Sequence, residues 1–184
     1  MAKRLTEAEY YQLIQSSYPA VVGGYSGLGY ADYELVRRKL RGILSDLLAG
    51  QRDNILLVSG ATAQGIGVVY EVAKEFRLPT LGIVSECAQP EDISCFCEQV
   101  FYVPDPDGTW EVKSSEGDSY VVEAGRRGQM FYLGGGEVAV NEIVEAKSKG
   151  VTVNVFSDFF PDPKEVEKRL RNSPDFVSRP TCFL

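Results

Sequence analysis

The chain has 184 residues, with 19 lysines and arginines against 26 aspartates and glutamates, and its formal charge is −7. This acidic balance disfavours nonspecific binding to nucleic acid or to an anionic membrane, so we expect neither as a partner. Histidine is absent, which excludes Ser-His-Asp and Cys-His catalysis and any histidine-ligated metal. The length suits one domain, residues 1–184, that buries enough apolar surface to fold without disulfides or a structural metal.

No segment predicts a membrane span, a leader peptide or a metal site. Apolar runs stay shorter than about 18 residues and the first residues lack an apolar core, so we expect a cytoplasmic protein. No C-x-x-C pair occurs among Cys87, Cys95, Cys97 and Cys182, and we expect reduced thiols. Cys95 and Cys97 beside Cys87 have a metal site as their alternative, but no histidine or nearby fourth cysteine completes a ligand set, so we expect ordinary buried thiols. No cofactor is expected, because the chain has neither a G-K-[ST] sequence nor a lysine at a glycine junction.

Apolar and amphipathic stretches alternate along the chain. A polar leader, residues 1–17, is predicted to be helical, and a buried strand then begins at Pro19 and runs into a glycine turn. Helices are predicted at residues 31–48, 67–76 and 164–171, and further strands at residues 54–59, 80–85, 99–103, 129–133 and 151–156. Residues 104–117 predict a long polar surface loop, a candidate cover for a site, and residues 161–184 predict a proline-initiated helix and a tail.

Several of the predicted strands are rich in valine, isoleucine and leucine, with few polar interruptions, which is typical of parallel strands covered on both faces. We therefore expect a Rossmann-like, doubly wound α/β fold with a mainly parallel sheet of about six to seven strands and helices on both faces. Ligands bind such sheets at the carboxyl ends of the strands. Glycine-bearing junctions follow Val22, Val58 and Leu133, so we expect all three to lie at that edge and to converge on one crevice.

The junction after Leu133 is the most informative of the three. Its three glycines, residues 134–136, follow an apolar strand and precede a segment patterned as a helix from Glu137. Residues without Cβ let the backbone approach an anion closely, and the unpaired N–H groups and dipole of a first helical turn favour negative charge. Glu142 follows within two turns, where its carboxylate is expected to bind a sugar hydroxyl or to act in acid/base chemistry. A tight turn without any ligand is the alternative.

The residues expected to hold the phosphate or the rest of the ligand come from the three junctions and from the segment before the last glycine-bearing strand. They are Gly24, Ser26, Gly60, Thr62, Gln64, Gly65, Gly134, Gly135, Gly136, Glu137, Arg126 and Arg127. Alternatives stay open for the polar ones: Ser26, Thr62 and Gln64 also suit turns, and the arginine pair also suits a solvated helix end. Asp118 is expected to be the N-cap of the helix that runs towards Glu123.

Taken in order, the three glycine motifs resemble those of the SLOG superfamily, which comprises the Lonely Guy phosphoribohydrolases and their nucleotide-binding relatives. The resemblance spans roughly residues 21–156, through residues 23–27, 57–67 and 133–142. The last motif is similar to the signature P-G-G-x-G-T-x-x-E. That similarity implies that Gly135 and Gly136 are its paired glycines and that Glu142 is the glutamate that serves substrate binding and glycosidic cleavage. It also implies a Rossmann-like fold and a homodimer.

The chain departs from the family pattern at two places. Val138-Ala139 stands where Gly-Thr normally cradles the phosphate, and the catalytic arginine expected near Asp118 or Ser119 has no counterpart there. Losing that arginine removes a charge-assisted clamp on the leaving group. We therefore expect a protein that binds a nucleotide or another small phosphorylated ligand. The alternatives are hydrolysis of the N-glycosidic bond of a nucleoside 5′-monophosphate, with Glu142 as the catalytic residue, and a non-catalytic interaction scaffold.

Overall fold

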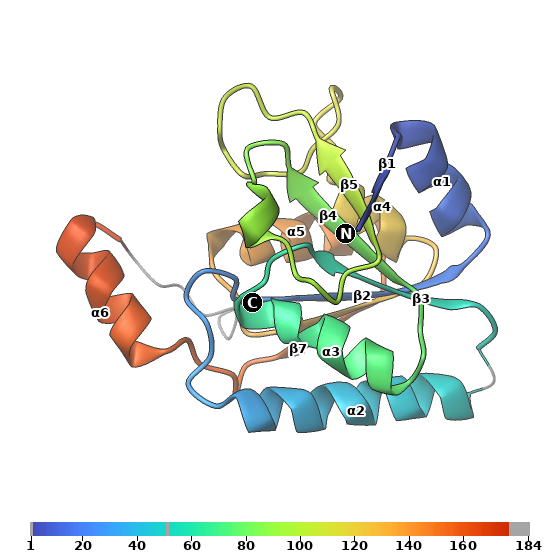
Figure 1. Cartoon of the computed structure of the whole chain (residues 1–184), viewed down its shortest axis with the longest axis horizontal. Coiled ribbons are helices and arrows are strands. Elements are labelled where there is room, and N and C mark those ends of the chain that lie inside the picture. The colour runs from blue at the N-terminus through green and yellow to red at the C-terminus, as the bar shows by residue number, and fades with distance from the viewer. Residues whose placement is uncertain (1, 51, 177–184) are drawn as a thin grey trace.

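The computed structural model describes residues 2–50 and 52–176, and its centre is one seven-stranded sheet in which all strands are parallel (Figure 1). The strand order is β1-β5-β4-β3-β2-β6-β7. The strands are β1 (Lys3–Leu5), β2 (Tyr18–Gly24), β3 (Ile55–Gly60), β4 (Thr80–Ser85), β5 (Gln99–Val103), β6 (Gln129–Leu133) and β7 (Val153–Phe156). The helices are α1 (Glu7–Gln15), α2 (Tyr33–Ala49), α3 (Val68–Glu75), α4 (Tyr120–Gly125), α5 (Glu137–Ser148) and α6 (Pro163–Asn172), with short 3-10 helices η1 (Gly65–Gly67) and η2 (Pro90–Asp92).

Helices cover both faces of this sheet, so the predicted Rossmann-like, doubly wound architecture is confirmed. Alternate residues of the strands point to opposite faces, and two buried clusters result. On one face, α2 and α3 pack through residues such as Leu40, Leu44 and Val69. On the other face, α1, α4 and α5 pack through residues such as Ile14 and Ile143. Each cluster is continuous along the sheet, which makes the sheet a rigid support for the loops at its edges.

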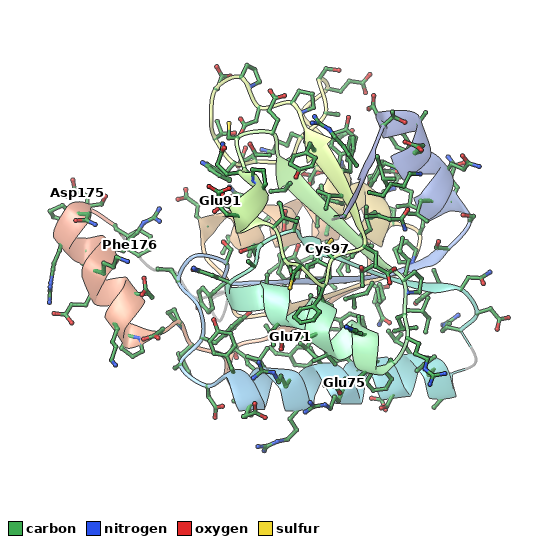
Figure 2. All side chains as sticks on the ribbon, in the orientation of Figure 1. Glu71, Glu75, Glu91, Cys97, Asp175 and Phe176 are labelled. Atoms are coloured by element: carbon green, nitrogen blue, oxygen red, sulfur yellow. The ribbon has the colours of Figure 1, made fainter. Side chains whose placement is uncertain are left out.

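Helices α2 and α3 are also joined by ion pairs at the surface. The guanidinium of Arg37 lies 3.0 Å from the carboxylate of Glu71, and that of Arg41 lies 2.8 Å from the carboxylate of Glu75. Figure 2 shows Glu71 and Glu75 on α3, directly above α2. One lateral side of α2 is therefore occupied by α3.

The predicted helical leader is wrong at its start. Residues Lys3–Leu5 form β1, a short edge strand that pairs in parallel with β5, and a capping box between Thr6 and Glu9 then begins α1. Edge strands of natural sheets are often short and charged. With only three residues, two of them charged, β1 shows no alternation of apolar and polar residues. The strand signal was therefore too weak for the pattern to reveal it.

The structure also corrects the predicted N-cap of α4. Ser119 is the N-cap, and its side chain accepts a hydrogen bond from the amide of Val122. Asp118 lies one residue earlier and pairs with the ammonium of Lys149 at 2.6 Å. Either residue type suits an N-cap, so the sequence alone did not decide between the two neighbours.

The remaining elements agree with their predicted positions. The strands expected at residues 80–85, 99–103 and 129–133 are confirmed, and the others shift by one or two residues at their ends. Helix α6 starts with the predicted proline after the N-cap Asp162. It has no buried residue and extends away from the body of the protein (Figure 1). Residues 177–184, with Cys182, lie outside the described part of the chain.

Three cysteines, Cys87, Cys95 and Cys97, belong to the described residues, and all three are free thiols. The expected burial is wrong for Cys95, which is exposed, and Cys87 is half-buried. Cys97 is buried in the same cluster as residues of α2 and α3, and burial raises the pKa of its thiol to about 11. The described residues contain no group of three or more cysteines, histidines or carboxylates placed to hold a metal ion. They also contain no helix with the length and apolarity to cross a membrane.

Candidate functional site

The strand order places a topological switch point between β2 and β6. From β2 the sheet continues through β3, β4 and β5 on one side and through β6 and β7 on the other. The two central strands end side by side, because Gly24 pairs with Leu133. The loop after β2 leads to α2 on one face, and the loop after β6 leads to α5 on the opposite face. In doubly wound sheets this divergence opens a crevice that holds ligands.

The first two glycines after β6 are explained by the protein's own structure. Gly134 has a φ of +65° and Gly135 a φ of +131°, which L side chains rarely adopt. The amide of Gly134 donates a hydrogen bond to the carbonyl of Phe156 at 3.0 Å. A Cβ at Gly134 would lie 2.6 Å from the ring of Tyr25. These two glycines turn the chain sharply from β6 into α5, whether or not a ligand is bound.

The third glycine, Gly136, is different. It is the N-cap of α5 with φ −92° and ψ −156°, an extended conformation open to any residue, and no side chain caps the helix. A Cβ built at Gly136 would meet nothing within 4 Å. Within the described chain, the amides from Gly136 to Ala139 have no hydrogen-bond acceptor. The amino end of α5 therefore presents unpaired donors and the positive end of the helix dipole to open space.

The second glycine junction follows β3 and serves mainly to tie the loops together. Thr62 accepts a hydrogen bond from the amide of Gln64 at 3.1 Å, so Thr62 acts as a turn former. Gly65 has a φ of +57°, and its amide donates to the hydroxyl of Tyr33 at 3.2 Å. The side chain of Gln64 is exposed, and a Cβ at Gly60 would meet nothing within 4 Å. Among the predicted residues of this junction, Gly60 leaves room for a side chain and Gln64 has an exposed one, while the Gly60 carbonyl accepts a hydrogen bond from the Tyr70 hydroxyl at 3.0 Å.

The first junction is held by a tyrosine whose role the sequence did not predict. The hydroxyl of Tyr30 donates to the carbonyl of Leu133 at 2.8 Å and accepts from the amide of Tyr25 at 3.2 Å. A Cβ at Gly24 would lie 1.9 Å from that hydroxyl. The close approach of Tyr30 therefore explains Gly24, and it fixes the ends of β2 and β6 relative to each other. Ser26 is exposed in the turn that follows.

Arg126 and Arg127 are not brought to the glycine junctions. They follow the carboxyl end of α4 and precede β6, where Gln129 pairs with Ala20 near the start of β2. They therefore lie at the amino edge of the sheet, opposite the glycine loops. Arg126 pairs with Glu123 at 3.1 Å on the surface, which agrees with a solvated helix end.

Glu142 lies on the side of α5 that faces the sheet, where its carboxylate accepts a hydrogen bond from the hydroxyl of Tyr132 at 2.7 Å. The pKa of Glu142 is raised from 4.5 to about 7, chiefly by desolvation and also by the nearby carboxylates of Glu145 and Glu111, while the hydrogen bond from the Tyr132 hydroxyl opposes the rise. A Cβ at Gly23 would lie 2.2 Å from the Tyr132 ring. Gly23 thus makes room for the tyrosine that holds Glu142.

The long loop between β5 and α4 lies beside this carboxyl group. Asp105 organises the loop, because its carboxylate accepts hydrogen bonds from Ser85, from Thr109 and from the amide of Trp110. Trp110 has a φ of +62° and a side chain that is 51% exposed. The next residue, Glu111, accepts a hydrogen bond from the Asn141 amide of α5 at 3.2 Å. The predicted surface loop therefore docks on α5 next to Glu142.

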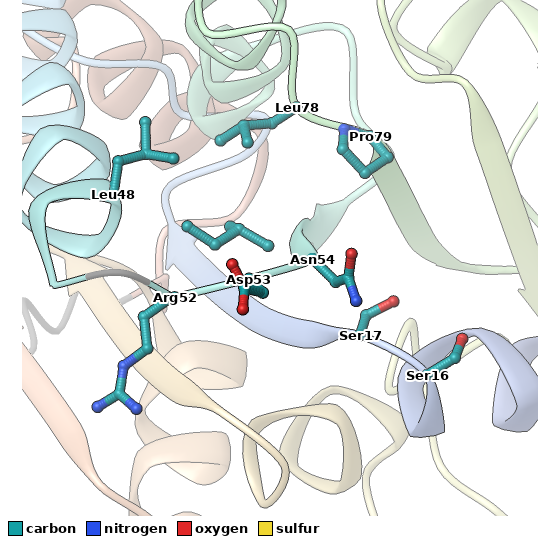
Figure 3. A pocket seen from close by; sticks show the side chains of 9 residues that line it. Ser16, Ser17, Leu48, Arg52, Asp53, Asn54, Leu78 and Pro79 are labelled. Atoms are coloured by element: carbon teal, nitrogen blue, oxygen red, sulfur yellow. The ribbon is translucent and has the colours of Figure 1, made fainter.

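A separate hollow lies at the amino edge of the sheet, away from the glycine junctions. It measures about 500 Å³ and lies where α1, α2 and α3 connect to the strands that follow them. Figure 3 shows its polar lining, with Ser16, Ser17 and Asn54 on one side and Arg52 beside Asp53 on the other. Doubly wound sheets bind ligands at the opposite edge, so this hollow is not the candidate site.

Comparison with known proteins gives no family for the chain. No model of a protein family matches it, and no curated protein matches it. The candidate site therefore depends on its geometry alone.

Proposed function

We propose that the chain binds a nucleotide or nucleoside phosphate, with the phosphate at the amino end of α5. The observation that carries this proposal is Gly136. Its backbone dihedrals do not require glycine, and a Cβ built there would meet no atom within 4 Å. The amides of residues 136–139 have no hydrogen-bond acceptor in the described chain. A glycine with no internal role at an uncapped helix start suits close approach of an anion.

The surroundings of this helix end suit the rest of a nucleotide. Glu142 follows Gly136 by six residues, about 9 Å along the helix axis, and offers a carboxyl group for a sugar hydroxyl. Across the switch point, Ser26 and Gln64 present exposed polar side chains from the loops after β2 and β3. Gly60 leaves open space beside them. These groups supply donors and acceptors of the kind that ribose and base require.

Substitutions at Gly136 separate ligand binding from folding. Gly136→Asp adds an N-cap side chain that stabilises α5 by roughly a few tenths of a kcal/mol, and it places a carboxylate where the phosphate is proposed to lie. Gly136→Asn adds a similar cap without the charge. We expect calorimetric titration with AMP, a cyclic nucleotide and a dinucleotide to reveal a ligand for the wild type. The aspartate variant should bind that ligand at least about tenfold more weakly, and the asparagine variant should bind it more tightly than the aspartate variant.

The proposal fails if no nucleotide of this panel binds at millimolar concentration. It also fails if the Gly136→Asp variant binds as tightly as the wild type. Thermal unfolding of both variants provides the control, because each should melt at or above the temperature of the wild type. A loss of affinity with retained or raised stability cannot arise from misfolding.

A second candidate function is hydrolysis of the N-glycosidic bond of a nucleoside 5′-monophosphate. The observation that favours it is Glu142, because a carboxyl group with a pKa of about 7 is divided between its acid and base forms at neutral pH. The family resemblance would place the catalytic arginine near Asp118 or Ser119. In this chain Ser119 caps α4 and Asp118 pairs with Lys149. Chromatographic detection of free base after incubation with AMP tests this candidate. Unchanged turnover in Glu142→Gln would remove Glu142 from the mechanism.

A further inference from the structure

The loop between β5 and α4, residues 104–119, runs along the carboxyl edge of the sheet from β5 to α5. Two strands, β4 and β3, separate β5 from the central strand β2, and Figure 1 shows the loop in yellow-green beyond the carboxyl ends of β4 and β5. At its far side Glu111 accepts the hydrogen bond from Asn141 of α5, and the next residue, Val112, is buried in the same cluster as Ile143 of α5. The loop therefore forms a packed wall beside the amino-terminal half of α5.

Trp110 sits in this wall with a backbone conformation that its residue type disfavours. Its φ is +62°, which is an outlier for a bulky residue. The carboxylate of Asp105 holds it there, because it accepts hydrogen bonds from the amides of Trp110 at 2.8 Å and Thr109 at 3.0 Å. The hydroxyl of Ser85, at the end of β4, donates to the same carboxylate at 2.7 Å. Strain that the surrounding contacts maintain in this way indicates a role for the residue in function.

The indole of Trp110 has no partner of its own among the described residues. Half of the residue is exposed, no aromatic ring packs against it, and no cation lies over its face. A large flat apolar group that a rigid loop presents to solvent suits stacking on another flat group.

The position of Trp110 relative to α5 fits the far end of a nucleotide. Asn141 follows Gly136 by five residues, about 7.5 Å along the helix axis, and Trp110 directly precedes the Glu111 that bonds to Asn141. In a nucleotide the ribose joins the phosphate to the base. A ligand with its phosphate at Gly136 and its ribose near Glu142 therefore carries its base farther along this wall, where Trp110 lies.

We infer that Trp110 stacks on the base of the bound ligand, and that the ligand is a purine nucleotide. This assignment rests on the proposed function and adds the class of base to it. Stacking on an aromatic side chain needs only the flat face of a base. A purine offers two fused rings to the indole and a pyrimidine offers one, so a site that depends on stacking favours the purine.

The fluorescence of Trp110 tests this assignment, because it is the only tryptophan of the chain. We expect AMP and GMP to change the indole fluorescence saturably, with the same dissociation constants that calorimetry gives. Ribose 5-phosphate should bind through its phosphate and leave the fluorescence unchanged. UMP should bind at least about fivefold more weakly than AMP, since its base has the smaller stacking surface.

Substitutions of Trp110 separate stacking from folding. Trp110→Gly removes the indole and suits a φ of +62°, so the variant should stay folded, which its melting curve checks. Its affinity for AMP should fall at least about fivefold, while its affinity for ribose 5-phosphate stays within about twofold of the wild type. Trp110→Phe keeps a ring and should recover most of the loss. Phe96→Ala removes another exposed ring, one contacted by Lys74 of α3, and should bind AMP as the wild type does.

The outcomes distinguish this assignment from the phosphate site. Stacking is overturned if AMP binds without changing the indole fluorescence, or if Trp110→Gly binds AMP as tightly as the wild type, as expected of an indole that serves a protein contact instead. The phosphate site then stands, because Gly136→Asp reports on it separately. Equal affinities for UMP and AMP would overturn the purine preference. If neither AMP nor ribose 5-phosphate binds at millimolar concentration, the proposed function fails and the stacking role fails with it.

Discussion

At the scale of single residues, two carboxyl groups organise the region around α5 in opposite ways, the buried Asp105 and the half-buried Glu142. Asp105 accepts several hydrogen bonds from a loop and a strand, so its charged form is favoured and its pKa lies below its ordinary value, chiefly because of the Ser85 hydroxyl. Glu142 accepts one hydrogen bond from Tyr132 and is otherwise desolvated, so its neutral form is favoured. The contacts of one carboxyl group therefore favour its charged form, and the surroundings of the other favour its neutral form.

The raised pKa of Glu142 predicts a pH dependence of stability. Its native pKa of about 7 exceeds the ordinary value of 4.5, so its contribution to the free energy of unfolding is complete below pH 4.5 and is lost as the pH rises through 7. The loss is on the order of 1–3 kcal/mol. Urea unfolding at pH 5, 6, 7 and 8 should show this fall in the wild type but not in Glu142→Gln, which should be the more stable protein at pH 8. Equal pH profiles would contradict the assignment, and Glu137→Gln on the same helix is the control.

Asp105 predicts a local loss of order. Asp105→Ala leaves the Ser85 hydroxyl and the amide of Trp110 without their acceptor, and no other hydrogen bond among the described residues then holds the Trp110 amide at its positive φ. We expect the melting temperature to fall by several degrees and the fluorescence of Trp110, the only tryptophan of the chain, to change. Asp107→Ala, at an exposed position of the same loop, should change neither property. Equal behaviour of the two variants would contradict the anchoring role of Asp105.

At the scale of elements, the glycines at the ends of β2 and β6 differ in what they do. Gly23→Ala places a Cβ 2.2 Å from the Tyr132 ring and forces that ring away from Glu142. Such overpacking costs about 1–3 kcal/mol. Gly27→Ala, four residues later, meets no atom within 4 Å and should alter stability by less than about 0.5 kcal/mol. Denaturant unfolding of both variants checks this contrast, and similar losses would show that Tyr132 does not depend on Gly23.

The sequence predicted the strands of the sheet well wherever a buried strand has an uninterrupted apolar run. It did not predict β1, because Lys3–Leu5 is too short and too charged to show a period. It also did not separate glycines needed for packing or turning, such as Gly24 and Gly134, from Gly136, which has neither role. That distinction depends on tertiary contacts: the hydroxyl of Tyr30 folds back onto Gly24, and the ring of Tyr25 reaches Gly134 from the end of the neighbouring strand β2.

At the scale of the whole molecule, the strand order decides which predicted residues meet. Parallel strands bring the three glycine junctions to one edge, as their positions after strands implied. The same topology takes Arg126 and Arg127 to the other edge, because they precede β6 instead of following it. In the sequence these two arginines lie within ten residues of the glycines after β6. In the fold the whole length of β6 separates the arginines from those glycines.

The central claim is that the first amides of α5 receive a negatively charged group. Titration of the ¹⁵N-labelled protein with AMP, followed through its amide resonances, tests this most directly. The account predicts saturable shifts for the amides of Gly136, Glu137 and Val138, which have no acceptor in the described chain, and little change for those of Gly65 and Ile66, which bond to Tyr33 and Tyr25. Shifts confined to residues away from the carboxyl edge of the sheet, or no shift at millimolar AMP, would contradict it.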